Sequence, residues 1–153
     1  MRYVLTLLTG NPILTLAILA WALAQIIKLL ITLRAAGFWD WKNLLSSGGM
    51  PSSHSAAVCA CAASIGWRYG LSSPLFAIAA IMAAVVMYDA AHVRRETGEQ
   101  AKILNYMMDN WTGEADDILA RDLKELIGHT PLQVAMGALL GIAVGLGGIW
   151  LMQ

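Results

Sequence analysis

Two histidines in this chain each stand where an apolar segment begins. His54 follows a Gly-Gly-Met-Pro-Ser-Ser run at 48–53, and His129 stands between Gly128 and a Thr-Pro pair. Serine, threonine and proline in these positions start helices, and a helix N-terminus favours an anion because it carries unpaired N–H groups and the positive end of the helix dipole. We therefore expect phosphate to bind beside His54. The alternative is that this stretch only begins a membrane helix, with His54 solvated at the interface.

Cationic side chains suited to phosphate lie in two other segments. Lys28 interrupts the first apolar segment, and Arg94 and Arg95 follow the third. In phosphoryl transfer, fixed cations and N–H donors hold the charge, one group attacks phosphorus, and another protonates the departing oxygen. Histidine can perform either of the last two tasks near neutral pH. Two histidines, these cations and the hydroxyls of Ser52 and Ser53 therefore predict phosphoryl transfer without a metal.

Other polar residues are interpreted structurally. Glu114, Asp116 and Asp117 stand where a loop meets a helix, and carboxylates there favour the helix start, so we predict no metal site. Cys59 and Cys61 point to opposed sides of one helix and are interpreted as small buried hydrophobic residues. The sequence predicts neither a metal nor a cofactor.

The elements that hold these residues are predicted to cross a membrane. Of 153 residues, 58% are hydrophobic and 13% are charged, which is too apolar for a soluble domain of this size. The ten basic and ten acidic residues cancel, so nothing in the charge indicates a nucleic-acid partner. We predict a single membrane-embedded domain over residues 1–153.

Long apolar segments predict an all-α integral membrane protein with about four transmembrane helices, at Ile13–Leu33, Ser55–Leu71, Pro74–His92 and Pro131–Met152. Between the third and fourth spans, Glu96–Gly128 holds most of the acidic residues and cannot span. Apolar residues recur there at helical spacing, which predicts two amphipathic helices broken near residues 112–113. Their packing stripes are Ala101, Leu104, Met108 and Trp111 in the first helix, and Leu119, Leu123 and Leu126 in the second.

The order of the spans brings the candidate site residues to one membrane face. The loop after the first span and the segment after the third share a side, so five residues can meet there with Lys28 nearby: His54, Asp89, Arg94, Arg95 and His129. Lys28 faces this site, because an ionisable residue inside a span is costly, or else extends to the headgroups as an anchor. More basic residues flank this face than the other, so the positive-inside rule makes it cytoplasmic.

A stripe of glycines runs along the last span, at Gly137, Gly141 and Gly145. Small residues at four-residue intervals let two helices pack closely in a membrane. The stripe packs either within the chain or between two copies, in which case the protein is a homo-oligomer.

Three motifs in this order resemble the divergent branch of the type 2 phosphatidic acid phosphatase (PAP2) family, which is related to the vanadium-dependent haloperoxidases. They are Gly-Gly-Met-Pro-Ser-Ser-His-Ser-Ala at 48–56, Tyr-Asp-Ala-Ala-His-Val-Arg-Arg-Glu-Thr-Gly-Glu-Gln-Ala at 88–101, and Leu-Ile-Gly-His-Thr-Pro-Leu-Gln-Val at 126–134. The resemblance implies that His129 is a nucleophile that forms a phosphohistidine and that His54 is the general acid. It also implies that Lys28 and either Arg94 or Arg95 bind phosphate, together with the backbone beside His54.

The chain departs from the pattern of the wider family near the nucleophile. That family places an aspartate four residues after the nucleophilic histidine to hold the imidazole, whereas this chain has Gln133. Gln133 can accept a hydrogen bond but adds no charge, so either Gln133 or Asp89 holds the ring. Arg34 follows Lys28 by six residues, whereas the family spacing is seven, so Arg34 receives no role. His92 occupies a position at which the resemblance to this branch implies glycine, so it receives no role either.

The resemblance and the site residues together imply a membrane lipid phosphate phosphatase that works without a metal through a phosphohistidine. Phosphatidylglycerophosphate, phosphatidic acid and polyprenyl pyrophosphate are all admissible substrates, and the sequence does not choose among them. A second hypothesis is a non-catalytic membrane module that binds anionic lipid headgroups or a protein partner. A third is a small transporter that uses Lys28 and Asp89 as an intramembrane ion pair.

Overall fold

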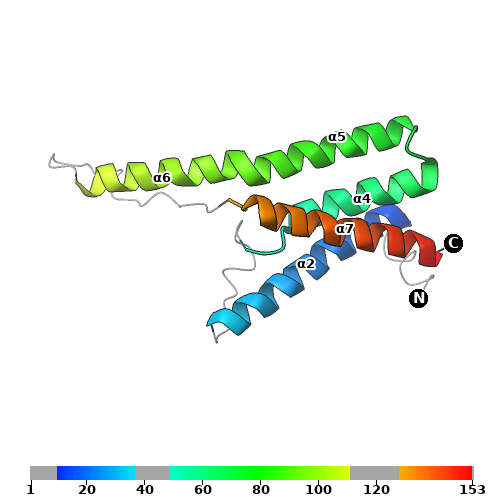
Figure 1. Cartoon of the computed structure of the whole chain (residues 1–153), viewed down its shortest axis with the longest axis horizontal. Helices are drawn as coiled ribbons and strands as arrows, with labels where there is room; N and C mark the ends of the chain where they lie inside the picture. Colours follow the sequence, from blue (N-terminus) through cyan, green and yellow to red (C-terminus); the bar gives the residue numbers. More distant parts are fainter. Residues whose placement is uncertain (1–9, 37–48, 111–127, 153) are drawn as a thin grey trace.

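The computed structural model describes residues 10–36, 49–110 and 128–152, and every element in these ranges is a helix. The elements are α2 (Pro12–Ala36), α4 (Ser53–Tyr69), α5 (Pro74–Tyr88), the π-helix η1 (Asp89–Val93), α6 (Arg94–Asp109) and α7 (Pro131–Met152). Figure 1 shows α2 and α5 running in one direction and α4 and α7 in the other. The prediction of an all-α protein is confirmed for the described residues.

Three helices have the length and composition of membrane spans: Pro12–Arg34, Pro74–Met108 and Pro131–Met152. The predicted second span, α4, has 17 residues, which gives it a length of about 26 Å. It packs against α7, α2 and α5, so protein rather than lipid surrounds much of it. Such a position suits a helix whose buried residues include three serines. The first, third and fourth predicted spans are therefore confirmed in length and composition, and the second span, α4, stays a prediction.

Small side chains lie inside the bundle and large apolar side chains lie on its surface, as expected for a protein surrounded by lipid. The core of α2, α4 and α7 is a cluster of alanines, and the large apolar side chains point outward. Lipid, unlike water, does not penalise exposed apolar side chains, and small residues allow the helices to approach closely. The buried cluster consists of Ala20, Ala24, Ala56 and Ala60, whereas the exposed residues include Leu30, Ile78, Ile81, Leu139 and Trp150.

The third span does not end at His92 as predicted. α5, η1 and α6 form one continuous helix, and α6 extends beyond the rest of the bundle (Figure 1). The first amphipathic helix predicted after Glu96 is present as α6, and it continues the third span without a break, because the change from apolar to charged residues marks a change of surroundings and does not stop a helix. Of the first predicted stripe, Ala101 is buried and Leu104 is exposed. The break near 112–113, the second stripe and the acidic trio Glu114, Asp116 and Asp117 lie outside the described residues.

The glycine stripe of α7 packs on α4 within the chain. Gly137, Gly141 and Gly145 are buried, and a Cβ atom at each position would meet a backbone carbonyl oxygen of α4. The carbonyls belong to Ser52, Ala56 and Ala60, which repeat with the same four-residue spacing. We call this contact the glycine seam. A homo-oligomer would need another surface than this stripe, and it stays a prediction.

Candidate active site

A cavity of about 350 Å³ gathers four of the predicted site residues. His54 comes from the first turn of α4, Asp89 and Arg94 from the π-helix and its end, and His129 from the segment before α7. The apolar part of the lining comes from the end of α5 and from η1: Val85, Val86 and Ala90. Residues that are far apart in the sequence therefore share one space, as the predicted topology requires.

Two of the hydrogen bonds of His129, whose exposed fraction is only 4%, attach it to neighbouring helices. Its backbone N–H donates to the carbonyl of Ala90 in the π-helix, with an N–O distance of 3.0 Å. Its side-chain Nδ1 lies 3.3 Å from Oε1 of Gln133. The imidazole is thus attached on one side to η1 and on the other side to the first turn of α7.

Gln133 belongs to a capping box at the start of α7. Its Oε1 accepts a bond of 3.0 Å from the backbone N–H of Thr130, and Oγ1 of Thr130 lies 3.4 Å from the backbone N of Gln133. Because Oε1 already accepts from a backbone N–H, the atom beside His129 is the amide oxygen, and Nδ1 must be the donor. The other ring nitrogen, Nε2, then carries the lone pair. Gln133, and not Asp89, holds the ring of His129.

Burial lowers the pKa of His129 below the ordinary histidine value of 6.5. The bond with Gln133 and a backbone hydrogen bond with Gly49 act in the opposite direction, whereas the positive charge of Lys28 and the nearby His54 lower the pKa further. The imidazole of His129 is therefore neutral at neutral pH, which is the form that can act as a nucleophile.

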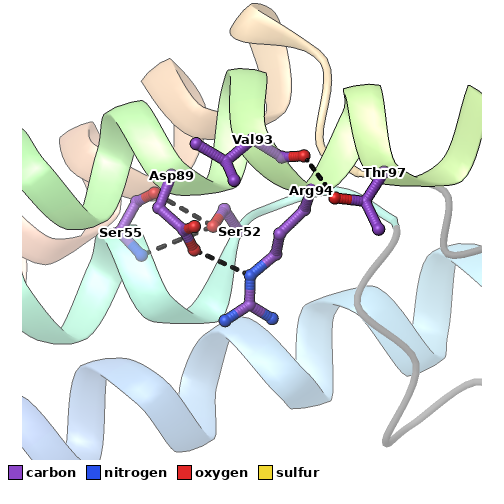
Figure 2. Close-up of polar contacts among 6 residues, drawn as sticks. All are labelled: Ser52, Ser55, Asp89, Val93, Arg94 and Thr97. Carbon is purple, nitrogen blue, oxygen red and sulfur yellow. Dashed lines mark hydrogen bonds and ion pairs between the residues drawn. The ribbon is translucent and has the colours of Figure 1, made fainter. Parts of the chain in front are cut away.

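The π-helix explains how Asp89 and Arg94 come together. In η1 the backbone N–H of Arg94 donates to the carbonyl of Asp89, five residues earlier, so residues five apart are one turn apart. Nε of Arg94 donates to Oδ2 of Asp89 over 2.8 Å, as Figure 2 shows. In an ordinary α-helix, residues three or four apart are the neighbours. A π-turn thus brings this ion pair to the cavity and also directs the Ala90 carbonyl toward His129.

The two serines before His54 do not line the cavity. Ser52 is fully buried and caps α4: its Oγ accepts from the Ser55 hydroxyl at 2.9 Å and from the Ser55 backbone N–H at 3.4 Å (Figure 2). Its own N–H donates to the backbone carbonyl of Gln133 over 3.0 Å. Ser53, the first residue of α4, is also buried. The predicted phosphate-binding hydroxyls are therefore used in helix capping and packing, and only His54 of this motif reaches the cavity.

Lys28 is an interior side chain with an exposed fraction of 6%, so it does not extend to the headgroups. It packs under Gly49, where a Cβ would lie 2.7 Å from Cε of Lys28. Gly49 also has a φ of 94°, a conformation that favours glycine. Lys28 does not line the cavity, but its charge reaches His129.

The remaining predicted cations and the third histidine lie elsewhere. Arg95 is exposed and does not line the cavity, whereas Arg94 does. Arg34 is exposed and lines a separate surface groove on α2. The ring of His92 stacks on Tyr88 at 4.6 Å with an angle of 14° between the planes. Among the described residues, no three His, Cys, Asp or Glu side chains are grouped as metal ligands.

Sequence reasoning missed two features of the site. One is the π-turn, for which the five-residue spacing of Asp89 and Arg94 is the only signal in the sequence. The other is the close approach of Gly128 to α6, where a Cβ would meet the backbone of Arg95. This approach needs a residue without a side chain, and it places the segment before His129 directly on the helix that carries Arg94.

Comparisons with known proteins match nearly the whole chain. The model of the divergent PAP2 family matches residues 9–144, a range that includes every candidate site residue. An uncharacterized membrane protein, YuiD, of Bacillus subtilis (strain 168) is 41% identical over 150 residues, which are 92% of this chain and 94% of that protein. No solved structure matches the chain.

Proposed function

This chain belongs to the divergent PAP2 family, and on that premise we propose that it is a membrane phosphatase that removes phosphate from an amphiphilic lipid phosphate. One observation carries the proposal: His54, Arg94 and His129, from three separate segments, line one cavity. Two histidines and a guanidinium around one space are groups that phosphoryl transfer uses. The substrate is a phosphomonoester or a pyrophosphate, such as phosphatidylglycerophosphate, phosphatidic acid or polyprenyl pyrophosphate.

His129 is the proposed nucleophile. Because its Nδ1 faces Gln133, its Nε2 attacks phosphorus and forms a P–N bond while the bond from phosphorus to the leaving oxygen breaks. His54, in its protonated form, gives its proton to the leaving oxygen. Burial lowers the pKa of His54, and the charges of Arg94 and Lys28 lower it further. The carboxylate of Asp89 acts in the opposite direction and favours the protonated form that this step needs. The products of this step are the lipid without the phosphoryl group and a phosphohistidine at His129.

Water completes the reaction. His54, now neutral, takes a proton from a water molecule whose oxygen attacks phosphorus, and the P–N bond breaks. Inorganic phosphate leaves, His129 returns to its neutral form, and His54 is protonated again. No atom outside the protein, the lipid phosphate and one water molecule is needed.

Three groups of donors are proposed to hold the phosphoryl oxygens. Asp89 accepts a bond from Nε of Arg94, and within the described part of the chain this is the only bond of that guanidinium, so both of its terminal NH₂ groups are available. The N-terminus of α4 presents the backbone N–H group of His54, which lines the cavity. Lys28, buried beside Gly49, contributes a positive charge that acts on His129.

Phosphate release by the detergent-purified protein tests this proposal. The substrates are the three lipid phosphates named above, with EDTA present, and the variants are His54→Ala and His129→Ala. We expect wild-type release to survive the chelator and to fall at least about a hundredfold in both variants. The matched control is His92→Ala, which removes a histidine outside the cavity and should keep wild-type activity.

The phosphohistidine itself provides a second test. His54→Ala leaves His129 in place but removes both the proton donor of the first step and the group that activates water. With polyprenyl pyrophosphate, whose leaving phosphate needs no proton, phosphorylated His129 should therefore accumulate in this variant. Mass spectrometry of rapidly quenched protein would locate the phosphoryl group. Absence of turnover in the wild type with every lipid, or full activity of both histidine variants, would overturn the proposal in favour of a module that only binds headgroups.

The site end of the bundle is proposed to face the cytoplasm. Arg94, Arg95 and Lys102 follow α5 on this side, whereas Arg68 lies near the far end of α4. Positive residues concentrate on the cytoplasmic side of membrane proteins. Labelling of a single introduced cysteine at exposed Lys102 by a membrane-impermeant reagent should therefore occur only after the cells are opened.

A further inference from the structure

An apolar groove of about 480 Å³ runs along α4 beside the active-site cavity. Its floor consists of small buried residues, among them Cys59, Ala62 and Ala83, each with an exposed fraction below 10%. Its sides come from α5 and α7, and none of its lining residues carries a charge. The shape is that of a trough with a small-residue floor between two helices.

The groove begins close to the place where the cavity ends. On α5, Ala83 lines the groove and Val86 lines the cavity, about 4.5 Å apart along the helix axis. On α4, Cys59 and His54 are about 7.5 Å apart along the axis. Cys59, which lines the groove, contacts α5 at Met87: its Sγ lies 3.8 Å from Sδ of Met87, and methionine is a flexible side chain that adapts its shape readily. The two spaces thus follow each other along the same pair of helices.

Leu71 and Phe76 line the other end of the groove. A Cβ atom at Gly66 would lie 3.0 Å from side-chain carbons of both residues, so these side chains pack directly on α4 there. From His54 to Trp67, which also lines this end, α4 rises about 20 Å. This length is similar to the roughly 15 Å depth of hydrocarbon in one leaflet of a bilayer.

We propose that this groove binds one hydrocarbon chain of the lipid whose phosphate enters the cavity. The polar headgroup lies at His54 and His129, and the chain passes Met87 and lies on the small-residue floor toward Leu71 and Phe76. This inference rests on the proposed phosphatase function, because that function places the phosphate of the same lipid in the cavity.

Two substitutions on α5 distinguish binding of the chain in the groove from binding on the rest of the lipid-facing surface. Ala80→Phe places an aromatic ring in the groove, whereas Ala77→Phe adds the same ring on the same helix at an exposed position outside it. The substrates are hexadecyl phosphate and octyl phosphate, and the readout is kcat/KM for each. The ratio of long-chain to short-chain kcat/KM should fall at least about tenfold in Ala80→Phe, which is the effect of losing two buried methylene groups. It should not change in Ala77→Phe.

Retained turnover of octyl phosphate shows that Ala80→Phe is folded. An unchanged chain-length ratio in an active Ala80→Phe variant would overturn the inference, because the chain would then lie on another surface.

Crosslinking separates this inference from the proposed function. Hexadecyl phosphate with a diazirine near the chain end is bound to the wild-type protein and photolysed, and the labelled residues are mapped. Labels at Trp67, Leu71 or Phe76 support the groove even if no phosphate is released, in which case the phosphatase proposal alone fails. Phosphate release with labels scattered over the outer faces of the bundle supports the phosphatase and overturns the groove.

Discussion

The two sides of α4 are packed in opposite ways. On the α7 side, Gly141 lies so close to α4 that a Cβ would meet the carbonyl of Ala56, and no space remains. On the α5 side, small side chains such as alanine and valine leave space for both the candidate active-site cavity and the apolar groove. One side of this helix is a closed seam, and the other side is open to a ligand.

This difference divides the tasks of the protein. The seam joins the first turn of α4 to the first turn of α7, through the 3.0 Å bond from Ser52 to Gln133 as well as through the glycines. The two histidines are attached to these two turns, so the seam fixes their relative position. The open side contributes Asp89 and Arg94, whose side chains are each more than 40% exposed and can adjust to a ligand.

The seam should respond to a side chain far more strongly than the rest of α7. Gly141→Leu forces α7 away from α4, and overpacking of this kind costs about 1–3 kcal/mol or more. We expect a large fall in the thermal unfolding temperature in detergent and, because the histidines separate, loss of phosphate release. Gly147→Leu is the matched control, because no atom lies within 4 Å of a Cβ at that position. Equal effects of the two substitutions would show that the seam is not the rigid side of the bundle.

The hydrogen bond between Gln133, at the seam end of α7, and His129, the proposed nucleophile, should have the next largest effect on activity. Gln133→Ala removes the acceptor for Nδ1 of His129, and loss of such an orienting partner typically costs about 10–100-fold in activity. The pH dependence of kcat/KM in Gln133→Ala, compared with that of the wild type, distinguishes a loss of contact with His129 from a loss of folding. His129 must be neutral to attack, so wild-type kcat/KM should fall as the pH decreases through the lowered pKa of His129, below 6.5.

Gln133→Glu sharpens this test because it keeps the acceptor and adds a negative charge. A carboxylate beside the imidazole stabilises the protonated form, so the acid limb of the profile should move to higher pH. Gln133→Ala removes an interaction that raises the pKa and should move the limb to lower pH. Identical acid limbs in all three proteins would mean that Gln133 does not contact the nucleophile.

The open side should affect binding more than stability. Arg94→Ala breaks an ion pair whose partners are both substantially exposed, and such pairs contribute only about 0–1 kcal/mol. The unfolding temperature should therefore change little, while KM for a lipid phosphate rises because the cavity loses its guanidinium. Arg95→Ala, one residue further along the helix and outside the cavity, is the control. A rise in KM for Arg95→Ala but not for Arg94→Ala would reverse the assignment of the phosphate-binding arginine.

Much of this architecture follows from local sequence. Proline and a capping residue mark the start of α7 at Pro131, and the run of apolar residues marks its length, so the observed bounds equal the predicted ones. The order of the predicted spans placed His54 and His129 on one membrane face, because the number of crossings determines on which face each loop lies. Local sequence did not predict the end of the third span, since α6 continues the helix through charged residues that water solvates as readily in a helix as in a loop.

Tertiary structure decided which groups point into the cavity. Ser52 and Gln133 are both hydrogen-bonding residues close to a histidine, yet Ser52 is a buried helix cap and Gln133 holds the ring of His129. The π-turn at Asp89–Val93 pairs Arg94 with Asp89 at the cavity, and Lys28 is buried against Gly49. The sequence by itself determined the helices, their order and the residue types at the site, because capping and hydropathy are local properties. The direction of each side chain depends on close contacts between segments far apart in the chain, and only the folded bundle sets those contacts.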